Sequence, residues 1–198
     1  MWKTLGLLFI AAHARALAPS AATAPRLIDL PLQEPGGRAP LARAAVARRL
    51  EGRSVALYFA AAWCPACRRF LPQLAAWRAA RAELGGGGAE TRAEIVFVSS
   101  DRTAAEFDAH HAALGGDVLA VPFAEHAAAD ALKRHCGVWA GVESMRLGAR
   151  GRRSGVPALA VLGQDGGVLL HLDAEREGAR CLAAWDPAAC EPWSFEGA

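Results

Sequence analysis

The feature that most restricts the fold of this chain is an apolar run that leads directly into two closely spaced cysteines. Residues 55–60 read VALYFA, and a continuous apolar segment rich in strand-forming residues is typical of a strand buried on both faces. Cys64 and Cys67 follow, and they open a helical pattern of apolar residues that reaches Leu84. We therefore predict a buried strand, a short turn and a helix that begins at a CxxC pair.

Segments of strand-like and helix-like pattern alternate on both sides of this unit. We expect further strands at 27–32, 95–98, 158–162 and 168–172, and helices at 41–50, 103–114, 127–135 and 175–185. Ser100 or Asp101 is available to cap the helix at 103–114. This order of elements predicts an α/β domain with a mixed sheet and no repeats.

Length and charge narrow the classes of protein to which the chain can belong. Its 198 residues suffice for one domain with extensions, and 53% of them are hydrophobic. The formal net charge of +2 is too small to indicate a nucleic acid or an anionic membrane surface as partner. We expect a monomer that binds neither.

The amino terminus resembles a targeting segment. Lys3 provides a positive charge, residues 5–12 (LGLLFIAA) form a short apolar run, and Ala14 and Ala16 offer an A-x-A cleavage site. Eight apolar residues are too few to span a bilayer as a helix. We predict that residues 1–24 are a signal or targeting segment for the secretory pathway or an organelle. The alternative is an apolar tail on a cytosolic protein.

The CxxC pair has three chemical interpretations, of which one fits its setting. A structural zinc site needs four ligands, yet there is no second CxxC, and His110 and His111 are adjacent rather than spaced as ligands. Haem attachment needs a histidine where Arg68 stands. A strand before the pair and a helix after it favour a redox-active dithiol, and no metal or nucleotide cofactor is expected.

The two cysteines of this dithiol have different expected roles. Cys64 lies at the predicted helix N-cap, with Pro65 at the first helical position, where a missing N–H costs nothing. Free N–H groups and the positive end of the helix dipole stabilise a thiolate there. Cys67, one turn later, faces inward and reaches the sulfur of Cys64. Cys64 is therefore the predicted nucleophile and Cys67 the resolving thiol.

Residues 58–72 (YFAAAWCPACRRFLP) resemble the nucleoredoxin/tryparedoxin branch of the thioredoxin superfamily. Pro72 stands where that superfamily has a helix-kinking proline. Further segments follow in the order of the family: 96–101 (VFVSSD), 119–123 (LAVPF), 155–159 (GVPAL) and 186–193 (DPAACEPW). The resemblance implies that residues 25–198 form a thioredoxin-like domain, with a central mixed β-sheet flanked by helices.

The resemblance also implies residues that bind the client protein. Val156 and Pro157 would form a cis-proline loop beside the dithiol, and the backbone of Val156 would pair with the client. Trp63 would flank the cleft, although it can equally be a packing residue. Pro65 and Ala66, between the two cysteines, would tune the redox potential.

The chain departs from the family in several places. Ala66 replaces the second proline of the family's CPPC. Tyr58 stands where ordinary thioredoxins keep a buried aspartate, so the base for Cys67 is not identified. Residues 139–153 form an expected insertion, which holds Arg146, Arg150, Arg152 and Arg153. These arginines either dock acidic partners, belong to a solvated loop, or lie in a segment that is mistranslated from the gene.

Three cysteines lie outside the pair. We expect Cys136, at the end of an apolar helix, to be a buried core residue. Cys181 and Cys190 either form a disulfide in an oxidising compartment or remain free thiols.

The predicted function is a thiol–disulfide oxidoreductase that reduces protein disulfides through Cys64 and Cys67. Its partners would be disulfide-containing client proteins and an external reductant, either a thioredoxin reductase or a low-molecular-weight dithiol. One alternative is a disulfide oxidase or isomerase in a secretory compartment. Another is a redox-gated binding protein without turnover, and the family's usual location in cytosol and nucleus is the alternative to a secretory one.

Overall fold

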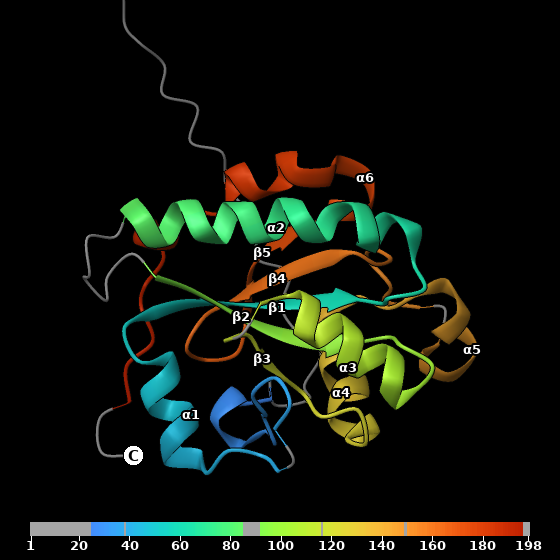
Figure 1. Cartoon of the computed structure of the whole chain (residues 1–198), viewed down its shortest axis with the longest axis horizontal. Helices are drawn as coiled ribbons and strands as arrows, with labels where there is room; N and C mark the ends of the chain where they lie inside the picture. Colours follow the sequence, from blue (N-terminus) through green and yellow to red (C-terminus); the bar gives the residue numbers. More distant parts are fainter. Residues whose placement is uncertain (1–24, 38, 85–91, 116, 149, 196–198) are drawn as a thin grey trace, which may run out of the picture.

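A five-stranded mixed sheet forms the centre of the structure, a computed structural model that describes residues 25–195 except 38, 85–91, 116 and 149. Its spatial order is β3-β2-β1-β4-β5 (Figure 1). The strands are β1 (Arg53–Ala60), β2 (Arg92–Ser99), β3 (Leu119–Ala120), β4 (Ala158–Leu162) and β5 (Val168–Leu172). The predicted targeting segment, residues 1–24, lies outside the described residues, so its prediction stays a prediction.

Strand β1 is the buried centre of the sheet. Seven consecutive residues, Ser54 to Ala60, are buried, as expected for a strand covered on both faces. β1 pairs parallel to β2 and antiparallel to β4. Because Ala60 pairs with Ser99 in a parallel register, the carboxyl ends of β1 and β2 meet at one edge of the sheet. Residues that follow these two strands are therefore brought together.

Helices cover both faces of the sheet. They are α1 (Arg43–Leu50), α2 (Pro65–Leu84), α3 (Ala104–Ala113), α4 (His126–Cys136), α5 (Ser144–Leu147) and α6 (Ala174–Glu177). Figure 1 shows α2 and α6 above the sheet and α1, α3 and α4 below it. None of the helices among the described residues is long and apolar enough to cross a bilayer.

The predicted first strand at 27–32 is wrong. Residues Leu27–Asp29 form a short 3-10 helix, and only Gln33, beyond the predicted segment, makes an isolated bridge with Ala120 of β3. Leu27, Ile28 and Leu32 are buried, and the 3-10 helix packs against α1. Their apolar character serves this packing, and Pro31 has no N–H with which to continue a ladder.

Two further expectations need correction, and one strand was missed. The last helix is broken: α6 ends at Glu177, and Gly178, with φ +58° and ψ −144°, leads into a 3-10 helix, Gly178–Ala184. The cap of α3 is Thr103, whose hydroxyl accepts from Glu106 N–H at 3.2 Å. Neither Ser100 nor Asp101 caps this helix. The two-residue strand β3 was not predicted, because two residues carry no readable pattern.

Candidate active site

The dithiol lies in the turn that joins β1 to α2, as predicted. Cys64 N–H donates to Ala61 O at 3.1 Å, and Cys64 O accepts from Arg68 N–H at 3.1 Å, the first turn of the helix. Cys64 is therefore the N-cap and Pro65 the first helical residue. Cys67 N–H points at Cys64 Sγ, 3.4 Å away. The cap geometry thus aims a free helix amide at the sulfur of Cys64.

The two sulfurs differ in their surroundings. Cys64 is 7% exposed and Cys67 is fully buried, so Cys64 is the more accessible of the two sulfurs. Burial is the main cause that raises the pKa of Cys67 far above its ordinary value, and a hydrogen bond from the backbone of Ala61 opposes it. Cys67 is therefore a protonated thiol at neutral pH and needs a base before it can react.

The second wall of the site is the loop before β4. The peptide bond between Val156 and Pro157 is cis, as the resemblance implied. The thiol of Cys64 donates to Val156 O at 3.5 Å, so this loop lies directly beside the reactive sulfur. Pro157 is buried, while Pro65, the residue after Cys64, is exposed. The dithiol and the cis-proline loop thus share one small surface.

Trp63 is fixed on that surface by the loop after β2. Its indole N–H donates to Ser100 O at 2.9 Å, and its ring is half-buried. The guanidinium of Arg102 lies 4.7 Å from the ring centroid, within the range of a cation–π contact. Both contacts come from the loop that follows β2, the strand next to β1. Trp63 is therefore held against the protein, and part of its ring remains exposed to solvent.

A buried acidic residue, which the sequence prediction missed, supports the turn. The side chain of Asp101 is inaccessible to solvent; its Oδ1 accepts from Ala62 N–H at 2.5 Å and its Oδ2 from Ser99 Oγ at 2.7 Å. His110 Nδ1 lies 3.7 Å from Oδ2. Although burial raises the pKa of Asp101, these hydrogen bonds and His110 more than offset it, and the net shift is downward.

Tyr58 lies in the interior beneath the dithiol. Its ring contacts Phe70 of α2, with centroids 6.0 Å apart, and His110 of α3, edge-on at 6.3 Å. Its buried hydroxyl has no hydrogen-bond partner among the described residues. Burial, and next the charges of Cys67 and Cys64, raise the pKa of Tyr58 well above its usual value. This hydroxyl therefore stays protonated.

A second buried network ties the segment 139–153 to the site. Lys133 Nζ contacts Glu143 Oε1 at 2.6 Å and donates to Ser99 O at 2.7 Å. The other oxygen of Glu143 accepts from Ser100 Oγ at 2.7 Å and from Ala140 N–H at 2.9 Å. Since Ser100 also holds the indole of Trp63, the segment is coupled to the wall of the active site.

The remaining cysteines are separate thiols. Cys136 is fully buried, as predicted, and burial raises its pKa to about 12. Cys181 is buried and Cys190 half-buried, and the structure forms no disulfide between them. Within the described part of the chain, no three His, Cys, Asp or Glu side chains cluster as metal ligands would.

Comparison with known proteins shows which family the chain belongs to. The profile of a family described as Thioredoxin-like matches residues 52–168, more than half of the chain. Nucleoredoxin-like protein 1 of Homo sapiens is 32% identical over 149 residues, which are 74% of this chain and 63% of that protein. Probable nucleoredoxin 2 of Oryza sativa subsp. japonica is 33% identical over 120 residues, 61% of this chain and 25% of the relative. The chain thus spans less than two thirds of both relatives.

Solved structures give the same fold. The thioredoxin from Wuchereria bancrofti superposes with a TM-score of 0.53 and 27% identity, covering 80% of this chain and 95% of that one. Tryparedoxin I from Leishmania major gives a TM-score of 0.51 and 26% identity, covering 79% and 85%.

A dithiol at the start of a helix, a cis-proline loop beside it and a mixed sheet of this order define a protein of the thioredoxin class. Within that class, the chain belongs to the thioredoxin-like family and is a nucleoredoxin/tryparedoxin-like member of it.

Proposed function

We propose that this protein reduces disulfide bonds in other proteins, with Cys64 as nucleophile and Cys67 as resolving thiol. The observation that carries the proposal is the placement of Cys64 Sγ, 3.4 Å from the Cys67 amide and 3.5 Å from Val156 O. The amide stabilises the thiolate, and the carbonyl belongs to backbone that a client strand can join.

The first step forms a mixed disulfide. The thiolate of Cys64 attacks one sulfur of the client disulfide, and the second client sulfur leaves as a thiolate that takes up a proton. The buried position of Cys67 keeps its thiol out of this step. The roles therefore follow from accessibility as well as from helix position.

The second step releases the client. Cys67 loses its proton and attacks Cys64 Sγ, so that the bond between Cys64 and the client breaks and the client leaves as a second thiolate. Two electrons pass from the dithiol to the client, and the protein is left with a Cys64–Cys67 disulfide. A further dithiol, supplied by a thioredoxin reductase system or a small molecule, returns it to the reduced state.

Three residues would shape the client cleft. We assign Trp63 and Pro157 to its walls and the backbone of Val156 to pairing with the client. Pro65 and Ala66 lie between the two cysteines in the sequence, where they would tune the redox potential. Pro65 is exposed and Ala66 half-buried, so each borders the surface that a client must approach.

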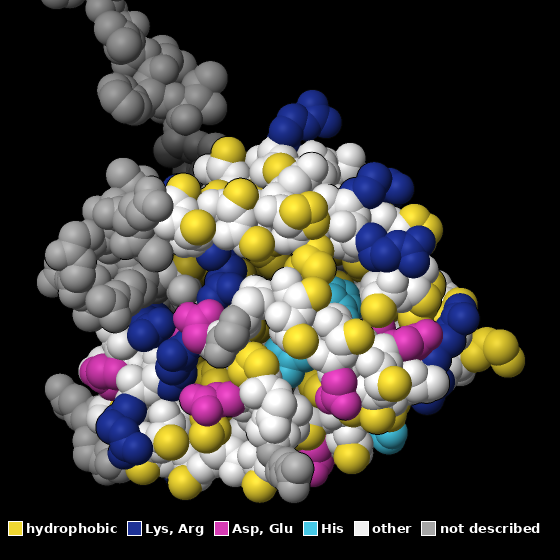
Figure 2. Space-filling view, viewed as in Figure 1, with side chains coloured by type: hydrophobic (Ala, Val, Ile, Leu, Met, Phe, Trp, Pro, Cys, Tyr) yellow, Lys and Arg dark blue, Asp and Glu magenta, His cyan; other side chains and the backbone are white. Residues whose placement is uncertain are grey.

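The segment 139–153 would contribute to the choice of client. Val142 and Met145 in it are 66% and 100% exposed, although Glu143 between them is anchored in the buried network. Several arginines near the dithiol and within this segment pair with no carboxylate among the described residues. They are Arg68, Arg69, Arg102, Arg150, Arg152 and Arg153. Figure 2 shows dark-blue side chains over the amino end of α2 and beside α5. This charge favours clients with acidic residues near the reactive disulfide.

Trapping of mixed disulfides tests the proposal. The Cys67→Ser variant lacks the resolving thiol, so it should accumulate client adducts that dithiol reductants reverse. The Cys64→Ser variant should accumulate none, and Cys190→Ser, which changes a half-buried cysteine outside the motif, should behave as the wild type. Adducts in Cys64→Ser but not in Cys67→Ser would overturn the assignment.

A further inference from the structure

We propose that Glu175 is a positioning residue that holds the cis-proline loop in the conformation with which a client strand pairs. The inference deepens the proposed function and rests on it, because the client is there assigned to the backbone of Val156 in this loop. Glu175 belongs to α6 and acts through the backbone of Gly155, without touching the reacting sulfurs.

Glu175 supplies the acceptor for a buried backbone amide. Gly155 is buried, and its N–H donates to Glu175 Oε2 at 3.1 Å, whereas Glu175 itself is an exposed residue. Buried N–H groups without an acceptor are rare, because their lost hydration must be offset by another hydrogen bond. An exposed side chain therefore satisfies the amide directly before Val156.

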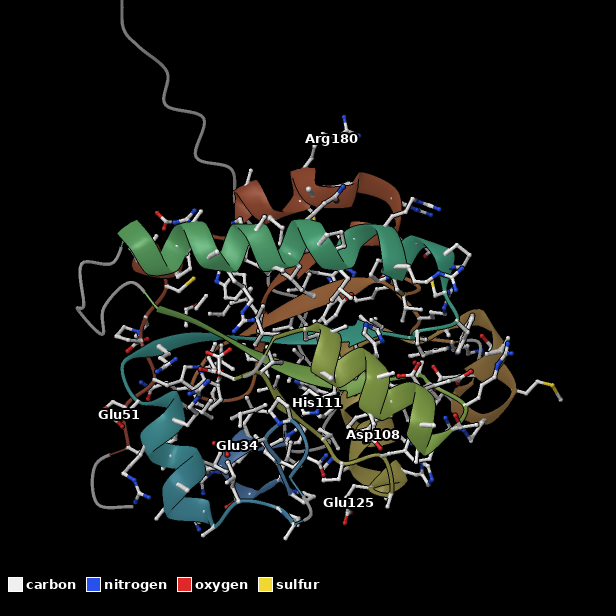
Figure 3. All side chains as sticks on the ribbon, viewed as in Figure 1. Glu34, Glu51, Asp108, His111, Glu125 and Arg180 are labelled. Atoms are coloured by element: carbon white, nitrogen blue, oxygen red, sulfur yellow. The ribbon has the colours of Figure 1, made fainter. Side chains whose placement is uncertain are left out.

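The position of α6 allows this contact. The helix lies on the same side of the sheet as α2 (Figure 1) and contacts both α2 and β4, the strand that follows the loop. Its first turn is fixed, because the side chain of Asp173 accepts from Arg176 N–H at 3.2 Å. Farther along, Arg180, labelled in Figure 3, projects away from the molecule. The start of α6 thus differs from the segment after it in facing the loop.

The cis-proline loop is fixed at both of its ends by backbone bonds. On the amino side, Ser154 N–H donates to Gly137 O at 3.3 Å. On the carboxyl side, Ala158 begins β4 and pairs with Phe59 of β1. The peptides between these two points lie outside the ladder of the sheet, so their conformation depends on side-chain contacts.

Side chains from two distant elements bond this stretch among the described residues, and one of these bonds is lost in the reaction. Glu175 accepts from Gly155 N–H, and the thiol of Cys64 donates to Val156 O at 3.5 Å. A Cys64 sulfur in a mixed disulfide carries no proton, so it no longer donates, and Val156 O is free for a client amide. In that state the bond to Glu175 still holds the loop.

A glycine at position 155 leaves the space that this contact needs. An added Cβ would lie within 3 Å of both Glu175 Oε2 and Arg152 Nη2, the far ends of two flexible side chains. Arg152 is itself held, because its Nε donates to Trp139 O at 2.9 Å. The φ of Gly155 is not positive, so alanine can adopt the same backbone. Gly155→Ala should therefore displace the carboxylate of Glu175 without removing it.

Loss of the bond should weaken client binding and leave the chemistry of the dithiol unchanged. A loop that is no longer held populates several conformations, and the apparent affinity falls by the fraction that remains competent. One hydrogen bond of this kind corresponds to about a fivefold change in an equilibrium constant. The two cysteines are untouched, so the rate of exchange within the bound complex should stay the same.

Stopped-flow single turnovers of the reduced protein with two probes separate binding from chemistry. One probe is a peptide disulfide with backbone on both sides of its cysteine; the other is hydroxyethyl disulfide, which is small, uncharged and without peptide backbone. In Glu175→Ala we expect the half-saturating peptide concentration to rise about fivefold, and the limiting rate and the reaction with hydroxyethyl disulfide to stay within about twofold.

Matched variants assign the effect to the hydrogen bond. Glu175→Gln keeps an acceptor oxygen and should behave as the wild type. So should Glu177→Ala, which removes another exposed carboxylate of the same helix. Gly155→Ala should reproduce Glu175→Ala, and the double variant should be no weaker than either one, because both changes break the same contact.

An unchanged half-saturating concentration in Glu175→Ala, or equal slowing with both probes, would overturn the inference. So would a Glu175→Gln variant as weak as Glu175→Ala. Should Glu175→Ala not fold, hydrogen exchange of the Gly155 amide in the wild-type mixed disulfide with the peptide decides: slow exchange is expected, and fast exchange contradicts the proposal. Failure of the proposed function is distinguishable, because the wild type would then react with neither probe.

Discussion

Replacement of Lys133 by methionine should destabilise the protein strongly, because it removes one partner of a buried ion pair. Lys133 and Glu143 have side chains only 3% and 10% exposed and lie 2.6 Å apart. Breaking a buried pair costs about 3–5 kcal/mol, since the remaining charge is left in the interior. Arg146, 3.1 Å from Glu143, still compensates part of that charge, so we expect about 3 kcal/mol. For a chain of this size that corresponds to a fall in Tm of about 6–12 °C.

Urea unfolding at neutral pH measures this loss, with Arg81→Met as the matched control. Arg81 pairs with Asp186 at 3.1 Å, but these side chains are 32% and 57% exposed, so the control should lose less than about 1 kcal/mol. The double variant Lys133→Met with Glu143→Gln should recover part of the loss, because no buried charge is left unpaired. Equal midpoints for Lys133→Met and Arg81→Met would refute the reasoning.

Three more predictions concern stability and client choice. Gly137→Ala should lose about 2 kcal/mol in urea unfolding, because Gly137 has φ +70° and an added Cβ would lie 2.6 Å from a backbone carbonyl. Burial lowers the pKa of His111, so only the unfolded state gains this proton as the pH falls below about 6.5, and stability should drop by up to about 1.4 kcal/mol per pH unit. His111→Gln should show a smaller drop between pH 7 and pH 5; an unchanged drop would contradict this. Alanine at Arg150, Arg152 and Arg153 should slow reduction of an acidic client at low salt and leave a small uncharged disulfide unaffected, and equal rates at every salt concentration would make the segment a bystander.

The dithiol could be predicted from the sequence because everything that defines it is contiguous. Strand, turn and helix follow within residues 55–84, and the position of Cys64 at the helix start requires no distant contact. The cis-proline loop is different, because residue 157 lies far along the chain, and only the family resemblance placed it beside Cys64. Periodicity alone does not bring these two segments together.

The contacts that hold the site from distant parts of the chain could not be predicted in the same way. Asp101 follows two residues after the end of β2, a strand parallel to β1, so its place at the dithiol edge was accessible in principle from topology. Its hydrogen bond to Ala62 depends on how the following loop turns, which local pattern does not encode. The ion pair of Lys133 with Glu143 joins a helix to the segment 139–153 through burial, a tertiary property. The error at 27–32 has the same origin, because a buried 3-10 turn and a buried strand can share one apolar composition.

Redox titration of the Cys64–Cys67 pair against glutathione buffers tests the central claim most directly. The account predicts one two-electron transition, absent in Cys64→Ala, with a potential of about −200 to −270 mV, the range of glutaredoxins and thioredoxin. A potential near about −120 mV would identify a strong oxidant and contradict the proposed direction of exchange. Absence of any transition in the folded protein would contradict the account as a whole.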